Sequence, residues 1–233
     1  QVYLLEVNPR ASRTIPFVSK ALGIPLARIA ARVMAGKSLK ELNFKGVPNI
    51  NGFCVKEAVM PFNKFQNVDP ILGPEMRSTG EVMGIGDTFA EAFEKAEVAA
   101  GVEIPKTGSV FISVRDTDKQ FLSEIIPSLD QEGFKLIATK GTANVIEDMG
   151  YKVMQIKKVL EGRPNIIDLM KNKEVNLVIN TTEGRESIQD SASIRRTALD
   201  QKICCTTTIQ GAKAICEVLS KKVDWSYQKL QDS

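Results

Sequence analysis

The sequence contains no histidine, and its few cysteines, Cys54, Cys204, Cys205 and Cys216, form no CxxC pair. Without imidazole, Ser-His and Cys-His nucleophile systems are excluded, as is a histidine general base near neutral pH. Zinc sites that combine cysteine with histidine are excluded as well. We interpret the cysteines as reduced thiols of a cytoplasmic protein. Acid–base chemistry would have to use carboxylates, lysine or tyrosine.

Strong charge and long apolar runs are also missing. The formal net charge of +3 is too small to indicate a nucleic-acid-binding protein, which usually carries a concentrated basic stripe. The apolar stretches are short and interrupted by Lys or Arg, so we expect no membrane span and no secretory leader. The chain opens without Met inside an expected strand at residues 2–7, which indicates a piece cut from a longer protein.

The first hundred residues mix helical and strand patterns. Residues 25–36 carry apolar side chains at helical spacing, with Pro in the first turn and Gly at the stop. Residues 101–108 have no periodicity and contain breakers, so we place a domain boundary there. The other expected elements are strands at 53–60 and 81–85, a Pro- and Gly-rich loop at 61–80 and an Ala-rich helix at 88–100.

The second half alternates short apolar strands with amphipathic helices. This alternation predicts an α/β fold, a Rossmann-like parallel five-stranded sheet with helices on both faces. In such sheets a ligand binds at the carboxyl ends of the strands, near the point where the strand order reverses. The expected strands are residues 110–114, 135–138, 152–156, 177–179 and 202–205, and the expected helices include 118–132, 143–149 and 209–219.

Polar residues follow two of these strands. Thr139 and Thr142, with a Gly between them, precede the expected helix at 143–149, and Asn180 opens a hydroxyl-rich run after another strand. Hydroxyls and free amides at a helix N-terminus suit a phosphate, and Lys119 and Lys158 would supply positive charge. These groups indicate a phosphorylated ligand such as a nucleoside monophosphate. The alternative is that the same residues are ordinary N-caps.

Four motifs of the second half resemble the methylglyoxal-synthase-like domain of carbamoyl-phosphate synthetase large subunits. They are Ala-Thr-Lys-Gly-Thr-Ala at 138–143, Lys-Val-Leu-Glu-Gly-Arg-Pro at 158–164, Ile-Asn-Thr-Thr at 179–182 and Ile-Arg-Arg-Thr-Ala at 194–198. The resemblance implies an allosteric pocket for UMP or IMP. By motif position, its contacts would be Lys119, Thr139, Thr142, Lys158, Asn180, Thr182 and Ser191.

The first segment carries a second resemblance. Glu6 and Asn8 are two apart, so on a strand they point the same way and offer oxygen ligands to magnesium, while Arg10 and Arg13 would neutralise phosphate. This pattern resembles the metal-binding strand of ATP-grasp ligases. The strings at 61–65 and 73–84 resemble the carbamate-phosphorylating half of the same synthetases.

The resemblance implies two domains, an ATP-grasp remnant at residues 1–103 and the allosteric domain at 104–233. The intact ligase would be cytoplasmic and oligomeric, and would use ATP with Mg²⁺ or Mn²⁺. It would make carbamoyl phosphate for pyrimidine and arginine synthesis, with ammonia from a small glutamine amidotransferase subunit. The Gly-rich flap, clamping Lys and upstream acidic ligand of an ATP-grasp site have no counterpart here, so we predict that this chain alone is inactive.

Three alternatives stay open at this point. Ornithine would bind between the two parts at Glu57, Leu72, Cys205 and Thr207, but the family has Tyr where Cys205 stands. A free-standing methylglyoxal-synthase-like lyase would need an aspartate with histidines nearby, and Asp118, Asp168 and Asp190 have none. The third alternative is a structural module whose polar strand ends are only helix caps.

Overall fold

The computed structural model describes residues 14–60 and 80–221, together with Leu4, Ser12, Phe62, Pro70 and Trp225. The strand predicted at 2–7, apart from Leu4, and most of the loop predicted at 61–80 lie outside the described residues. In the part of the chain that is described, no single helix is long and apolar enough to cross a bilayer. The helices at 14–22 and 26–34 would together be long and apolar enough by length and composition, but the chain bends by 112° between them.

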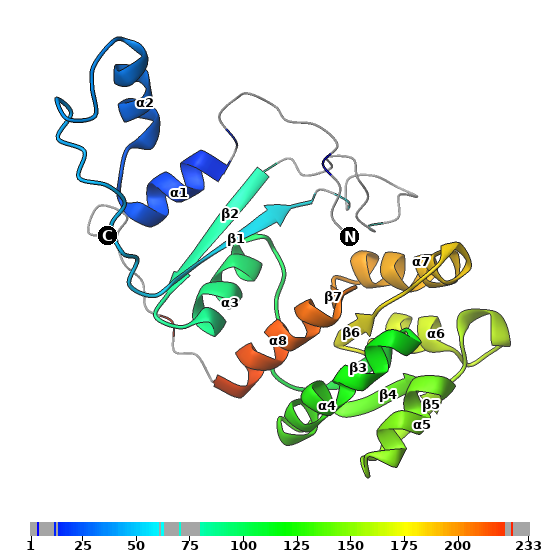
Figure 1. The fold of residues 1–233 in the computed structure, drawn as a ribbon. Helices are drawn as coiled ribbons and strands as arrows, with labels where there is room; N and C mark the ends of the chain where they lie inside the picture. Colours follow the sequence, from blue (N-terminus) through cyan, green and yellow to red (C-terminus); the bar gives the residue numbers. More distant parts are fainter. Residues whose placement is uncertain are drawn as a thin grey trace.

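Five parallel strands form the main sheet, in the order β5-β4-β3-β6-β7 (Figure 1). Both the number of strands and their parallel direction confirm the fold class predicted from the alternating pattern. The chain moves outward from β3 through β4 to β5 and then returns to the other side of β3, so the order reverses at β3. The strands are β3 (Ser109–Ser113), β4 (Lys135–Thr139), β5 (Val153–Ile156), β6 (Leu177–Asn180) and β7 (Cys204–Thr206).

Helices cover both faces of this sheet because successive strand residues are apolar on both sides. Val110 and Ile112 on β3 point into one core and Phe111 into the other, and all three are fully buried. The first core is closed by α4 (Leu122–Gln131), α5 (Lys140–Asp148) and α8 (Ile209–Lys221), and the second by α6 (Ile166–Lys171) and α7 (Arg185–Asp200).

Several predicted boundaries were wrong. The helix expected at 118–132 begins as a 3₁₀ turn, η2 (Asp116–Phe121), and continues as α4. The helix expected at 143–149 begins three residues earlier, at Lys140. The strand expected at 202–205 begins at Cys204, because Lys202 has a φ of 54° and belongs to the turn after α7. Helix α1 was not predicted; α6 and α7 were implied by the alternation of strands and helices, but no residue ranges were predicted for them.

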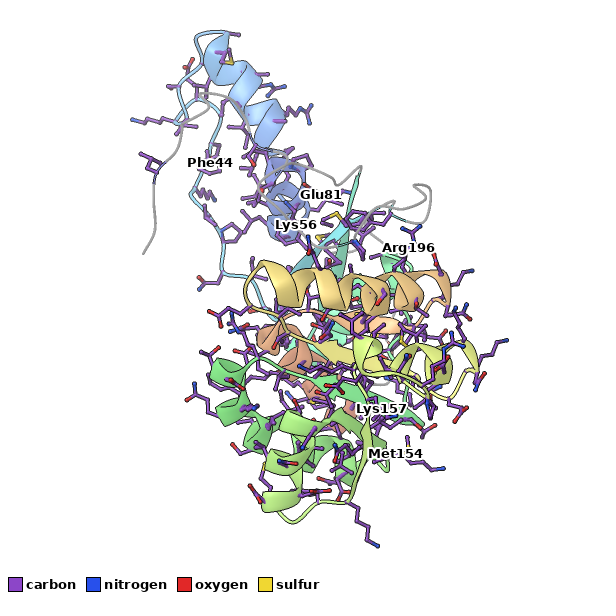
Figure 2. All side chains as sticks on the ribbon, turned by 90° about the vertical axis from the view of Figure 1, so that its right-hand side faces the viewer. Phe44, Lys56, Glu81, Met154, Lys157 and Arg196 are labelled. Carbon is purple, nitrogen blue, oxygen red and sulfur yellow. The ribbon has the colours of Figure 1, made fainter. Side chains whose placement is uncertain are left out.

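The first segment forms a smaller layer. Its helix α1 (Thr14–Leu22) lies beside the antiparallel strands β1 (Phe53–Val59) and β2 (Gly80–Gly86), and α2 (Leu26–Met34) extends away from them (Figure 1). On these strands, Lys56 Nζ lies 3.1 Å from Glu81 Oε1 (Figure 2). The Ala-rich helix α3 (Phe89–Ala99) packs directly onto β2 at Gly84, where a Cβ atom would lie 1.9 Å from the Ala92 carbonyl oxygen.

Helix α3 also contacts the five-stranded part. Its residue Ala90 belongs to the main core, and the helix packs against α8. The indole N–H of Trp225 donates to Glu94 Oε2 on α3 at 3.1 Å. The domain boundary expected at 103/104 falls in the irregular segment between α3 and β3, and it stays a prediction.

Candidate functional site

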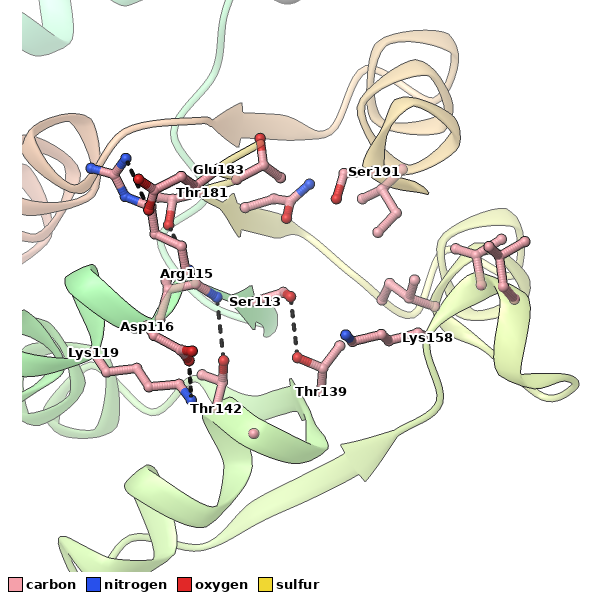
Figure 3. Close-up of a pocket in the computed structure, with 18 of the residues that line it drawn as sticks. Ser113, Arg115, Asp116, Lys119, Thr139, Thr142, Lys158, Thr181, Glu183 and Ser191 are labelled. Atoms are coloured by element: carbon pink, nitrogen blue, oxygen red, sulfur yellow. Dashed lines mark hydrogen bonds and ion pairs between the residues drawn. The ribbon is translucent and has the colours of Figure 1, made fainter. Parts of the chain in front are cut away.

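A cavity of about 640 Å³ opens at the carboxyl ends of β3, β4 and β6 (Figure 3). The order of the sheet reverses at β3, so this is the place where open α/β sheets bind ligands. The residues around it come from strand ends, helix starts and the loops between them. The lining consists of Ser113, Val114, Arg115, Asp116, Lys119, Thr139, Gly141, Thr142, Lys158, Val159, Leu160, Glu161, Ile166, Asn180, Thr181, Thr182, Glu183, Ser191 and Ile194.

All seven residues predicted as nucleotide contacts line this one cavity, although they belong to separate elements. Figure 3 shows Thr139 and Thr142 between Lys119 on one side and Lys158 on the other, with Ser191 across the opening. The set is Lys119 on η2, Thr139 at the end of β4, Thr142 on α5, Lys158 before the 3₁₀ turn η3 (Val159–Glu161), Asn180 at the end of β6, Thr182 beyond it and Ser191 on α7.

Asn180 is the most unusual residue of the lining. Its side chain is 1% exposed, and neither its amide nitrogen nor its amide oxygen has a hydrogen-bond partner among the described residues. Such a group costs about 1–3 kcal/mol, and buried polar groups in folded proteins nearly always have partners. A buried amide that faces a cavity without a partner indicates that a ligand or ordered water completes its hydrogen bonds.

The hydroxyl groups at this edge do not act as helix caps. Thr139 precedes α5 but makes no side-chain cap hydrogen bond, and its Oγ1 lies 3.1 Å from Ser113 Oγ instead. Thr142 Oγ1 accepts a hydrogen bond from the backbone N–H of Val114 at 3.2 Å. By contrast, Asn165 caps α6 by accepting from the Ile167 N–H at 3.0 Å. The capping alternative was therefore wrong for Thr139, and no side-chain cap occupies the first-turn amides of α5.

Lys119 places its ammonium over the first turn of α5. The absence of a side chain at Gly141 leaves room for it, since a Cβ there would lie 3.4 Å from Lys119 Nζ. The ammonium lies 2.7 Å from Asp116 Oδ1. This hydrogen bond with Lys119 and the positive charges of Lys119 and Lys158 lower the pKa of Asp116. A helix N-terminus next to an ammonium favours an anion.

Other lining residues were not predicted from the sequence. The Nε–H of Arg115 donates to Asp118 Oδ2 at 2.9 Å, its backbone N–H donates to Thr181 Oγ1 at 3.1 Å, and its Nη1 lies 3.9 Å from Glu183 Oε2. Arg115 thus ties the loop after β3 to the loop after β6. The rule that ligands bind at the carboxyl ends of parallel strands was applied to the strands at 135–138 and 177–179. It applies equally to the strand at 110–114 and would have identified Arg115.

Part of the cavity lining is apolar. Val159, Ile166 and Ile194 line it together with the exposed Leu160 and with Ser191. The lining therefore combines amides, hydroxyls and ammonium groups with apolar surface. This combination suits a ligand with an anionic end and a flat, weakly polar end.

Two described residues that were predicted for a possible ornithine site do not line this cavity. Glu57 lies on β1, and Thr207 is exposed after β7. Burial raises the pKa of Glu57, and burial together with Glu57 raises the pKa of Glu97 on α3 to about 7. Among residues 14–60 and 80–221 no group of three or more metal-binding side chains occurs. Glu6, Asn8, Arg10, Arg13 and Leu72 lie outside the described residues.

Two family models match the chain. The MGS-like domain matches residues 122–207, and the carbamoyl-phosphate synthase L chain ATP binding domain matches residues 1–42. A solved methylglyoxal synthase from Elizabethkingia anophelis is 19% identical with a TM-score of 0.41, over 48% of this chain and 79% of that one.

Curated relatives match almost the whole chain. The carbamoyl phosphate synthase large chain of Pseudomonas syringae pv. tomato is 59% identical over 231 residues, which are 99% of this chain and 22% of that protein. The large chain of Pasteurella multocida is 55% identical over 232 residues, with 99% and 22% covered. The chain thus spans about a fifth of the length of these relatives. It belongs to the family of carbamoyl phosphate synthase large chains, and it matches their ATP binding domain at residues 1–42 and an MGS-like domain at residues 122–207.

Proposed function

We propose that the cavity at the strand ends is an allosteric site for a nucleoside monophosphate such as UMP or IMP. The observation that carries this proposal is the buried amide of Asn180, which has no partner among the described residues and faces a cavity lined by two lysines. A nucleotide offers both hydrogen-bond donors and acceptors, so it can satisfy the amide nitrogen and the amide oxygen together.

The phosphate would lie at the first turn of α5. There it would meet the amides of that turn, the hydroxyls of Thr139 and Thr142, and the ammonium groups of Lys119 and Lys158. Charge-assisted hydrogen bonds of this kind are about twice as strong as neutral ones. The base would pack against the apolar part of the lining formed by Val159, Ile166 and Ile194, and Asn180, Thr182 and Ser191 would bind its polar atoms or the ribose.

For the intact protein we propose the activity in the relatives' name, synthesis of carbamoyl phosphate by a glutamine-hydrolysing ligase. Residues 1–103 would end its second ATP-grasp domain and residues 104–233 would form its allosteric domain. Glu6 and Asn8 would hold Mg²⁺ or Mn²⁺ against ATP, and Arg10 and Arg13 would contact the transferred phosphoryl group. A small amidotransferase subunit would supply ammonia in the cytoplasm for the pyrimidine and arginine pathways, within an oligomer.

Regulation would follow from a difference in effector affinity between two arrangements of the intact enzyme. The packing of α3 against α8 supports this proposal, because it joins the segment before residue 103 to the core of the effector domain. An effector that changes the position of α8 relative to α3 would then change the ATP-using part. The chain alone lacks most of an ATP-grasp site, and we propose that it has no ligase activity.

Ornithine is a second ligand that one observation favours. Glu57 and Glu97 are partly buried carboxylates, and the charge of Glu57 helps raise the pKa of Glu97. A cationic amine beside them would relieve this repulsion. Calorimetric titration with ornithine tests the idea, and a flat trace would remove it. Lyase activity finds no such support, because Asp118 pairs with Arg115 and Asp168 accepts a hydrogen bond from the backbone N–H of Asn165.

Calorimetric titration of the full chain with UMP and with IMP tests the main proposal. We expect a micromolar dissociation constant for at least one of them and its loss in Lys158→Ala. The matched control is Lys157→Ala, because Lys157 is the exposed neighbour whose Nζ contacts the Arg163 carbonyl oxygen at 3.5 Å and which does not line the cavity. Equal weakening by both substitutions would show only a general effect of charge, and no binding by the unmodified chain would refute the proposal.

A further inference from the structure

The charges that line the cavity cancel, which is unusual for a site proposed to bind a dianion. Three cationic side chains, Arg115, Lys119 and Lys158, are matched by three carboxylates, Asp116, Glu161 and Glu183. A phosphate entering the cavity therefore meets built-in anions as well as cations. What each carboxylate contacts decides whether it opposes the ligand.

Two of the carboxylates contact groups outside the proposed phosphate contacts. Glu183 Oε2 lies 3.9 Å from the Nη1 of Arg115, and Glu161 Oε2 accepts from the backbone N–H of Lys158 at 2.9 Å. Asp116 is different, because its Oδ1 lies 2.7 Å from Nζ of Lys119, the ammonium over the first turn of α5 (Figure 3).

We propose that Asp116 is an internal competitor of the phosphate group, occupying Lys119 while the cavity is empty and swinging into solvent when a dianionic ligand binds. The proposal rests on the proposed function of the site. The Asp116 side chain is 92% exposed, so it can leave without opening the core. The lowered pKa of Asp116, to which Lys158 also contributes, agrees with a carboxylate that lies in the field of both cavity lysines.

This competition would set both affinity and selectivity. An exposed ion pair is weak, so a ligand with two negative charges displaces the carboxylate. A monoanion gains little over the aspartate that it replaces, because it offers the same charge to the same ammonium. Asp116 would thus favour phosphate monoesters over singly charged anions and keep the site empty until the effector concentration is high.

Titration of the full chain and its Asp116→Asn variant with UMP, with IMP and with inorganic phosphate tests the proposal. We expect Asp116→Asn to tighten their binding about threefold to tenfold, the range for removing one nearby, screened like charge. The control is Glu183→Gln, which removes the same charge from the lining but not from Lys119 and should change the dissociation constant less than about twofold. In a Lys119→Met background, Asp116→Asn should have almost no effect, since the competition has been removed.

The outcomes separate the inference from the function on which it rests. Unchanged or weaker binding in Asp116→Asn, or equal tightening in Glu183→Gln, would overturn the competitor while leaving the nucleotide site in place. If the unmodified chain and Asp116→Asn both fail to bind UMP, IMP and inorganic phosphate, the proposed function falls and the competitor with it.

Discussion

Replacing Asn180 by Leu should have opposite effects on stability and on ligand binding. The side chain is 1% exposed and both polar atoms of its amide lack partners among the described residues, while leucine is apolar and of similar size. In the absence of ligand the substitution removes a desolvated amide and gains apolar burial. In the presence of ligand it removes a donor and an acceptor from the nucleotide.

The magnitudes follow from the burial. An unsatisfied buried polar group costs about 1–3 kcal/mol, so we expect the free energy of unfolding to rise by about 1–2 kcal/mol after small packing losses. For a chain of this size each kcal/mol shifts Tm by about 2–4 °C. Loss of the hydrogen bonds to the ligand should weaken nucleotide binding by about tenfold to a hundredfold.

Chemical denaturation without ligand and calorimetric titration with UMP measure the two effects. The control is Asn165→Leu, which removes a buried asparagine that caps α6 and donates to the Gly162 carbonyl oxygen at 3.1 Å. That substitution should destabilise the chain by about 1–2 kcal/mol. If Asn180→Leu destabilises the ligand-free chain as much as Asn165→Leu does, the amide has a structural partner and our interpretation of the cavity is wrong.

Three further predictions concern the rest of the chain. Because the pKa of Glu97 is raised from 4.5 to about 7, the folded state holds the Glu97 proton more tightly than the unfolded state does, and the free energy of unfolding should fall as pH rises through this range. In chemical denaturation, Glu97→Gln should show a smaller fall with pH. At about pH 8 the variant should be more stable than the unmodified chain by on the order of 2 kcal/mol. Gly84→Ala should cost about 1–3 kcal/mol or more because its Cβ would meet the Ala92 carbonyl, whereas Gly80→Ala, with its nearest neighbour at 3.9 Å, should change stability by less than about 0.5 kcal/mol. In a coupled assay the chain alone should release no ADP from ATP and bicarbonate, and steady release would contradict its predicted inactivity.

The sequence predicted the sheet well because its strands are short apolar runs buried on both faces. The residue ranges of helices α6 and α7, which the alternation implied, were not predicted, for different reasons. Helix α6 has only six residues, too few for periodicity to show, and the sequence of α7 is dominated by polar and charged residues, so no apolar stripe stands out. The start of the 202–205 strand was misplaced because the left-handed conformation of Lys202 leaves no mark in the pattern of apolar residues.

The cavity residues could be found because parallel strands bring their carboxyl ends to one edge of the sheet. Thr139 ends β4 and Asn180 ends β6, and β3 lies between these two strands. The ion pair of Asp116 with Lys119 and the missing partners of Asn180 were not predictable, since both depend on side-chain geometry across elements. The absence of a cap hydrogen bond from Thr139 likewise depends on Ser113, far away in sequence.

A crystal structure of the chain soaked with UMP and IMP would test most directly whether the strand ends hold a nucleotide. We predict that the phosphate lies at the first turn of α5 between Lys119 and Lys158, and that the Asn180 amide bonds to the ribose or base. A nucleotide bound elsewhere, or an empty cavity with the Asn180 amide bonded to protein or water, would contradict the proposal.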